Sequence, residues 1–147
     1  MNGMKPFRYS MENILSYRQD IEQTEKQKFA ELKNEYLKQR KVQEDLEEKL
    51  DKAASSKLNN PSSSIVDLKN LYQYMLFLQK KMEVQQQLVM EAGNRMESQR
   101  QRLIEAQKDR KIIEKHKDRC LERYTQELNR TEQQVNDELA LYSHMRK

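Results

Sequence analysis

The chain has 147 residues, of which 35% are charged and 35% are apolar, and its formal net charge at pH 7 is +4. The apolar fraction lies below the roughly 45–50% of globular domains, and tryptophan is absent. This composition excludes a domain that packs several layers around one large core. It leaves disorder or long helices that share narrow seams, and the regular spacing of the apolar residues favours the helices.

The sequence shows no segment that would take the chain into or across a membrane. The first ten residues lack the apolar run of a secretory signal, and the most apolar stretch, "YMLFL" at residues 74–78, is too short to span a bilayer. One cysteine, Cys120, rules out an internal disulfide and suits a reducing compartment. We therefore expect a cytoplasmic protein without direct membrane insertion.

The first helix is predicted over residues 10–53, where Ser10 can accept hydrogen bonds from the first free N–H groups. Its apolar stripe follows the three-and-four spacing of a coiled-coil seam. A double four-residue step at Ile21, Glu25 and Phe29 forms a stutter, which locally relaxes the supercoil. The apolar members of the stripe are Met11, Ile14, Ile21, Phe29, Leu32, Tyr36, Leu46 and Leu50.

A hinge is predicted at residues 54–63, because "SSKLNNPSSS" at residues 55–64 collects residues that favour turns. The second helix is predicted over residues 64–145, with Ser64 and Asp67 at the spacing of a capping box. Gly93 costs about 1 kcal/mol against alanine inside a helix and indicates a bend or a close approach of the partner helix. The seam of this helix contains Leu68, Leu71, Met75, Leu78, Met82, Gln85, Val89, Ala92, Met96, Gln99, Leu103, Ala106, Arg110, Ile113, Lys117, Cys120 and Tyr124.

The predicted fold is all-α, a single domain over residues 1–147 that forms a two-helix antiparallel coiled coil with a longer, overhanging second helix. If residue 54 faces residue 64, Met11 faces residue 107 or so. Everything past residue 110 then has no partner within the chain, so another molecule is expected to cover the tail. The alternatives are that the tail folds back or simply stays exposed. The apolar stripe nevertheless continues through Leu121, Tyr124, Leu128, Val135, Leu139 and Tyr142.

The sequence carries no pattern of catalysis, and we expect neither an enzyme nor a cofactor. Two glycines cannot build a phosphate-binding loop. His116 and Cys120 share a helix face but lack a third metal ligand, so no metal site is expected. Residues 100–119 hold eight basic and four acidic residues, which indicates a solvated face or a patch for an acidic partner. The interspersed acids argue against nucleic-acid binding.

Two stretches of the sequence resemble the flagellar export protein FliJ family. The opening "FRYSMENILSYRQ" is similar to the start of that family, and "LYQYMLFLQKKMEVQQQLV" is similar to its segment after the hinge. The late acidic pair, Asp137 and Glu138, matches more loosely. The residues that carry the resemblance are Phe7, Tyr9, Met11, Glu12, Ile14, Leu15, Arg18, Tyr72, Gln73, Tyr74, Leu78 and Met82.

The resemblance implies a non-enzymatic component of the flagellar type III protein export apparatus, at the cytoplasmic face of the membrane. Members are expected to insert as a shaft in the ring of the export ATPase FliI, to promote its assembly, to contact the cytoplasmic domain of the export gate FlhA, and to bind escort chaperones. Family position suggests that Leu46, Tyr74 and Leu78 contact the gate, although plain seam packing is the alternative for Leu46 and Leu78. The expected contacts with the ATPase ring are Phe7, Tyr9, Arg119, Leu121, Arg123, Tyr124, Leu128 and Val135.

Two other functions stay open at this point. One is a generic structural coiled coil, in which a second copy of the chain covers the tail stripe as a homodimer. The other is a nucleic-acid-associated scaffold, which a salt-sensitive gel shift would reveal.

Overall fold

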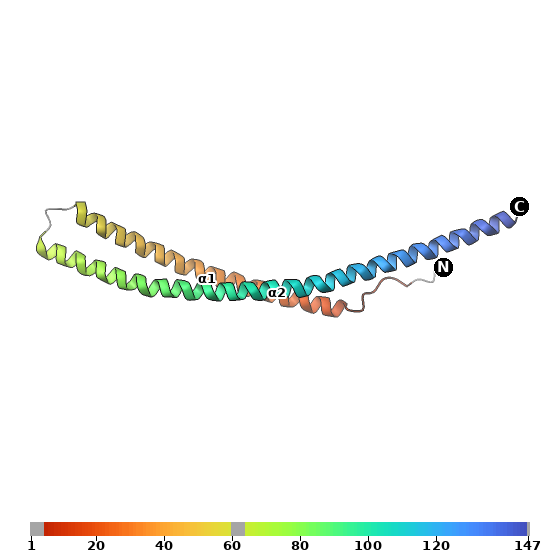
Figure 1. Cartoon of the computed structure of the whole chain (residues 1–147), viewed down its shortest axis with the longest axis horizontal. Coiled ribbons are helices and arrows are strands. Elements are labelled where there is room, and N and C mark those ends of the chain that lie inside the picture. The colour runs from red at the N-terminus through yellow and green to blue at the C-terminus, as the bar shows by residue number, and fades with distance from the viewer. Residues whose placement is uncertain (1–4, 60–63, 147) are drawn as a thin grey trace. The chain divides into compact units, whose positions relative to one another are not determined.

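A computed structural model describes residues 5–59 and 64–146 of the chain. It contains two α-helices, α1 at Glu12–Asn59 and α2 at Ile65–Met145, and no strand among the residues described (Figure 1). The two helices pack against each other and confirm the all-α hairpin coiled coil. The chain divides into two compact units, a hinge unit of residues 24–104 and a terminal unit formed by residues up to 23 and from 105 onward.

The ends of the helices differ in part from those predicted. The first helix begins at Glu12, whose N–H donates to the Tyr9 carbonyl at 3.2 Å, and it ends at Asn59 instead of near residue 53. Residues 60–63 of the predicted hinge lie outside the described residues. The second helix is capped as its sequence indicates, because the Ser64 hydroxyl accepts a hydrogen bond from the Asp67 N–H at 3.1 Å.

Polar residues in the seam of the hinge unit pair with one another and set the register of the two helices. The Gln85 side-chain amide donates to both the backbone carbonyl and the side-chain oxygen of Gln39, each at 2.8 Å. Two heptads away, Gln99 repeats this arrangement on the carbonyl and carboxylate of Glu25. A buried polar pair disfavours any other register, because a shift would leave its groups without partners.

This register differs from the predicted one, which would place Gln79 opposite Gln39. Gln85 takes that place because α1 continues to Asn59 before the chain turns. The seam residues themselves were predicted correctly for most of both helices: Leu78, Ala92 and Ala106 are buried, and most other predicted members are half-buried.

One seam assignment near the start of α1 was wrong. Leu15 is only 4% exposed, whereas the predicted member Ile14 is 42% exposed. Both residues suit a three-and-four pattern, so the spacing alone did not distinguish them. The structure brings Leu15 rather than Ile14 to face α2.

Gly93 marks a close approach of a side chain from the partner helix. A Cβ atom placed on Gly93 would lie 3.4 Å from Cε2 of Tyr36 and 3.7 Å from its Cδ2. The ring of Tyr36, which is half-buried, therefore packs onto the bare backbone of α2. This agrees with one of the two explanations that the sequence left open for this glycine.

Candidate partner-binding surfaces

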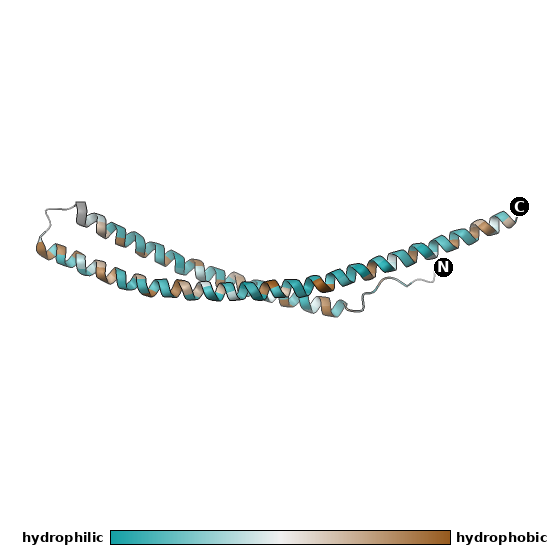
Figure 2. Ribbon diagram, in the orientation of Figure 1, coloured by the Kyte–Doolittle hydropathy of each residue, from teal (hydrophilic) through white to brown (hydrophobic). Residues whose placement is uncertain are grey.

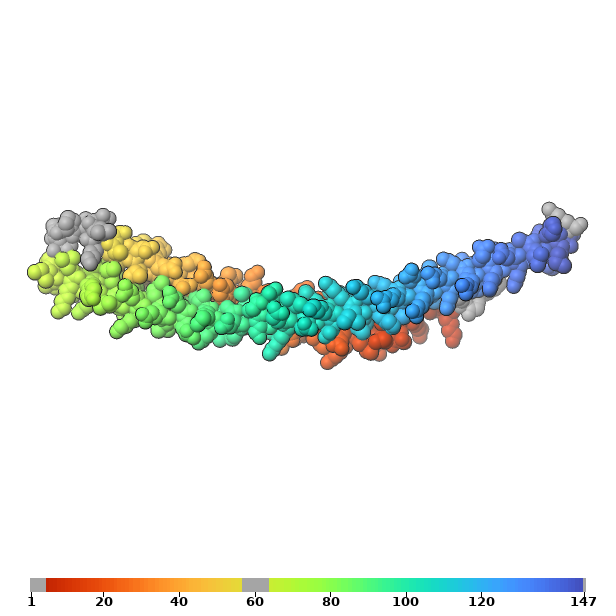
Figure 3. Space-filling model, in the orientation of Figure 1, coloured from red at the N-terminus to blue at the C-terminus, as the bar shows by residue number. Residues whose placement is uncertain are grey.

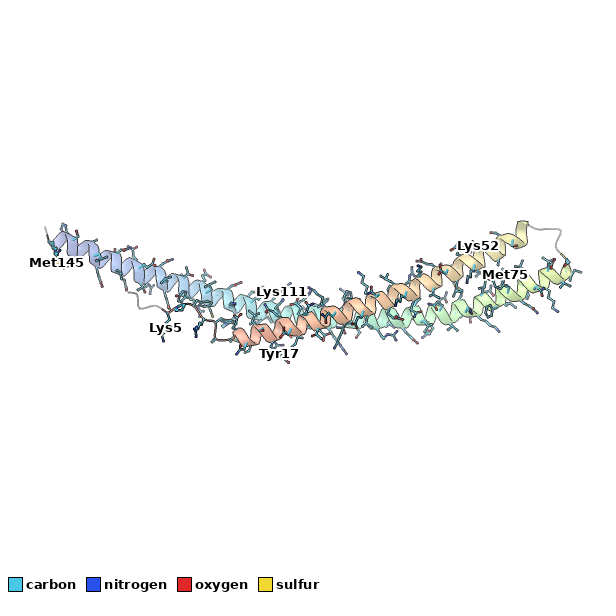
Figure 4. All side chains as sticks on the ribbon, turned by 180° about the vertical axis from the view of Figure 1, so that it is seen from behind. Lys5, Tyr17, Lys52, Met75, Lys111 and Met145 are labelled. Carbon is cyan, nitrogen blue, oxygen red and sulfur yellow. The ribbon has the colours of Figure 1, made fainter. Side chains whose placement is uncertain are left out.

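A non-helical segment before α1, residues 5–11, lies along α2 in the terminal unit, and we call it the N-terminal strap. Figure 4 shows Lys5 on this segment beside α2. The Tyr9 ring is 8% exposed, and its hydroxyl lies 2.6 Å from Nδ1 of His116 and 3.4 Å from the carbonyl oxygen of Ile113. The centres of the Tyr9 and His116 rings lie 5.5 Å apart. Burial, together with the nearby Cys120 and Glu12, raises the pKa of the Tyr9 phenol.

The strap continues along α2 as far as Tyr124. The Tyr124 hydroxyl donates to the Lys5 carbonyl at 2.6 Å, and the rings of Tyr124 and Phe7 lie 5.6 Å apart at an angle of 49°. Phe7 and Tyr124 are therefore half-buried against each other. The strap gives this part of α2 an intramolecular cover.

The prediction that everything past residue 110 lacks a partner within the chain is thus wrong. Lys117 pairs with Glu12 of α1 at 2.8 Å, and the strap covers α2 from there to Tyr124. Two features explain the error. The register places each residue of α1 about six residues further along α2 than predicted, as the pairing of Gln85 with Gln39 shows, and residues before α1 also lie against α2 and bring Lys5 to Tyr124.

Ion pairs between the helices use part of the positive charge of residues 100–119. Arg110 contacts Glu22 of α1 and, at 2.7 Å, Glu114 of its own helix. Glu22 and then Glu114 raise the pKa of the Arg110 guanidinium. Arg18 of α1 pairs with Asp109 at 3.2 Å. These pairs show that the seam residues Arg110 and Arg18 hold the helices together instead of facing a partner.

Beyond Tyr124, α2 continues without a break to Met145, and residues 129–146 are exposed. On the face shown in Figure 3, its blue end stands alone beyond the red N-terminal segment, and Figure 2 shows brown apolar residues along this otherwise hydrophilic stretch. The alternative of a folded-back tail is excluded. We call the apolar stripe here the C-terminal ridge: Leu128, Val135, Leu139 and Tyr142.

The ridge residues share one face of α2, because they are spaced by seven, four and three residues. Leu128 is half-buried and the other three are exposed. Leu141, which sequence reasoning missed, lies on the opposite face and is as exposed as Leu139, at 61% for both. Exposed apolar residues on a charged helix are typical of a surface that a partner covers.

The residues expected to contact the ATPase ring fall into two groups. Tyr9 of the strap is buried against α2, and Phe7 and Tyr124 pack on each other, so these three aromatic residues make intramolecular contacts. The other five are placed on the outside of α2, with Leu128 half-buried and the rest exposed: Arg119, Leu121, Arg123, Leu128 and Val135.

The three residues expected to contact the gate also differ in how deeply they are buried. Leu78 is 2% exposed and Leu46 is half-buried, which agrees with the alternative of seam packing. Tyr74 lies off the seam and is 43% exposed. Of the three, Tyr74 presents the most surface to a partner.

Among the described residues, no cluster of metal ligands accompanies these surfaces. The Cys120 sulfur lies 3.9 Å from both ring nitrogens of His116, but the described residues contain no group of three or more possible metal ligands. Within the part of the chain that the structure describes, neither helix has a stretch long and apolar enough to cross a membrane.

Comparison with known proteins identifies the hairpin. No curated protein and no solved structure matches the chain. A family model described as "Flagellar FliJ protein" matches residues 7–147, which includes the strap from Phe7, both helices and the C-terminal ridge. The chain is therefore a member of the flagellar FliJ protein family, a component of the flagellar type III export apparatus.

Proposed function

We propose that the protein acts as a shaft in the ring of the export ATPase FliI, promotes assembly of that ring, and couples it to the export gate FlhA and to escort chaperones. The observation that carries this proposal is the single helix beyond Tyr124 with its exposed C-terminal ridge. At 1.5 Å per residue, residues 125–145 extend roughly 30 Å. A rod of that length with exposed apolar residues along one face suits insertion into a central channel.

The strap defines where this rod begins. Its contacts with His116 and Tyr124 make the base of the rod a compact unit of strap, α1 and α2. The ridge past Tyr124 is left for the partner. Leu128 and Val135 are therefore the strongest candidates among the expected ring contacts, and Leu139 and Tyr142 extend the same face.

The decisive experiment measures ATP hydrolysis by the hexameric export ATPase with and without this protein. The wild type is expected to stimulate hydrolysis, and Leu139→Asp is expected to reduce that stimulation. Leu141→Asp is the matched control, because it makes the same change at a residue of equal exposure on the opposite helix face. Equal losses in both variants would contradict a directional ridge, and no stimulation by the wild type would contradict the shaft.

A homodimeric scaffold is the alternative in which a second copy covers the ridge. Light scattering at micromolar concentration distinguishes the two functions. A monomer is expected for the shaft, whereas a stable dimer that Leu139→Asp dissociates would favour the scaffold.

For the gate, we propose that the hinge unit contacts the cytoplasmic domain of FlhA through the side of α2 that bears Tyr74. Tyr72 offers a matched control because it is also exposed, and two residues along a helix correspond to a rotation of about 200°. Tyr74→Ala is expected to weaken capture by the gate domain, and Tyr72→Ala to leave it unchanged. Unchanged capture of the Tyr74 variant would remove this assignment.

A further inference from the structure

A shallow groove runs between the two helices of the hinge unit, on a side that the intramolecular seam leaves open. Its apolar lining comes from both helices, with Val42 and Leu46 on α1 and Phe77 and Val84 on α2. Gln85, whose amide is engaged by Gln39, forms part of the floor. The groove lies within residues 24–104 and is separate from the C-terminal ridge.

The apolar residues of this groove are more exposed than a two-helix seam requires. Val42, Phe77 and Val84 are exposed and Leu46 is half-buried. Phe77 and Val84 are seven residues apart and so lie on one face of α2. A furrow between two parallel or antiparallel helices is the surface onto which a third helix packs its side chains.

The charged side chains that line the groove are positive. Lys80 and Lys81 are its charged lining residues, and no acidic residue lines it among those described. Neither lysine forms an ion pair within the described part of the chain, and the Lys81 ammonium lies 4.8 Å from the centre of the Phe77 ring. An acidic partner would gain ion pairs here, and a basic partner would meet like charge.

The geometry points to a docking site for an acidic amphipathic helix of a partner protein. The apolar face of that helix would contact Val42, Phe77 and Val84, and aspartate or glutamate residues beside this face would reach Lys80 and Lys81. The inference concerns the chemistry of the partner helix and does not depend on which component of the export apparatus supplies it, nor on the shaft.

The test uses the full-length protein with ¹³C-labelled valine and leucine methyl groups. The probes are two helical peptides with leucines at i, i+4 and i+7, one with glutamates and one with lysines beside the leucine face. The glutamate peptide is expected to shift the methyl signals of Val42, Leu46 and Val84, and the lysine peptide is expected to bind roughly tenfold more weakly.

Charge reversal at the rim makes the test specific. In Lys80→Glu/Lys81→Glu, the preference is expected to invert in favour of the lysine peptide, while circular dichroism reports unchanged helicity. A preference that survives the reversal, equal binding of the two peptides, or shifts confined to other methyl groups would overturn the inference. Two further results would also overturn the inference, because each would identify a different ligand of the groove. The first is that anionic phospholipid vesicles cause the same shifts and the peptides cause none. The second is that unlabelled protein causes the same shifts.

Discussion

The neighbouring residues Leu15 and Ile14 provide a direct test of how the first turns of α1 face α2. The two side chains have similar volumes and lie in the same helix, but Leu15 is 4% exposed and Ile14 is 42% exposed. Replacing each by alanine therefore changes the buried apolar surface by different amounts at almost the same place. The structure predicts that Leu15→Ala is the more damaging change.

The difference can be estimated from burial. Leucine to alanine removes three carbon atoms, and at about 0.8 kcal/mol per buried methylene the buried Leu15 loses about 2 kcal/mol of unfolding free energy. A residual cavity adds to this loss and brings it to roughly 2–3 kcal/mol. Ile14 is less buried, and alanine recovers about 0.4 kcal/mol of helix propensity. Ile14→Ala should therefore cost only about 1 kcal/mol.

Equilibrium unfolding in urea, followed by circular dichroism, measures both variants. The slope of the unfolding free energy against urea concentration should be the same in the wild type and both variants, so that differences in the urea midpoint report differences in stability. Hydrogen exchange over residues 12–23 adds a local measure, because the two compact units can open separately. A loss in Ile14→Ala equal to or larger than that in Leu15→Ala would refute the assignment of Leu15 to the interface.

Three further outcomes are expected. Tyr9→Phe removes only the hydroxyl and its hydrogen bonds, and it should raise the hydrogen-exchange rate of the strap slightly. Tyr9→Ala also removes the ring that packs on α2, and it should raise that rate strongly. Equal exchange rates in both variants would contradict the role of the ring. Gly93→Ala should raise the unfolding free energy by about 0.5–1 kcal/mol, since the Tyr36 ring can accommodate a methyl group at 3.4 Å, and a fall in the urea midpoint would show that it cannot. Hydrogen bonding from Arg100, and then from Gln101, lowers the pKa of Glu97 from 4.5 to about 2, so the stabilisation from this carboxylate is complete above pH 4.5 and is lost as the pH falls from 4.5 towards 2. A carboxyl titration by NMR near 4.5 in the wild type would contradict this, and Arg100→Gln should raise the pKa of Glu97 towards 4.5.

The seam of the two helices was determined by the local sequence. The alternation of three and four residues from Leu71 to Tyr124 requires no knowledge of the partner, because helical geometry alone places such residues on one face. The same is true of the cap at Ser64, which depends on atoms three residues apart. The family resemblance was carried partly by this seam, at residues 71–89, and partly by residues 7–19.

The register of the helices and the strap were decided by the tertiary structure. The predicted register depended on where α1 ends, and helix ends are the least reliable feature of a sequence prediction because several residues can extend the last turns equally well. The pairing of Gln85 with Gln39 identifies the register, since a hydrogen bond between these two distant residues can form in one register only. The strap has no periodicity to reveal it: Tyr9 and Phe7 are two aromatic residues in a non-helical segment.

Burial also decided which candidate residues remain available to partners. The sequence alone grouped Leu78 with Tyr74 and Tyr9 with Val135, because all are apolar or aromatic residues near matching motifs. Whether such a residue faces its own chain or a partner depends on what lies opposite it in space, which its sequence neighbours do not specify. The periodic pattern therefore determined which residues form a stripe, and only the folded chain determined that Tyr124 of this stripe is half-buried against the strap whereas Val135, Leu139 and Tyr142 are exposed.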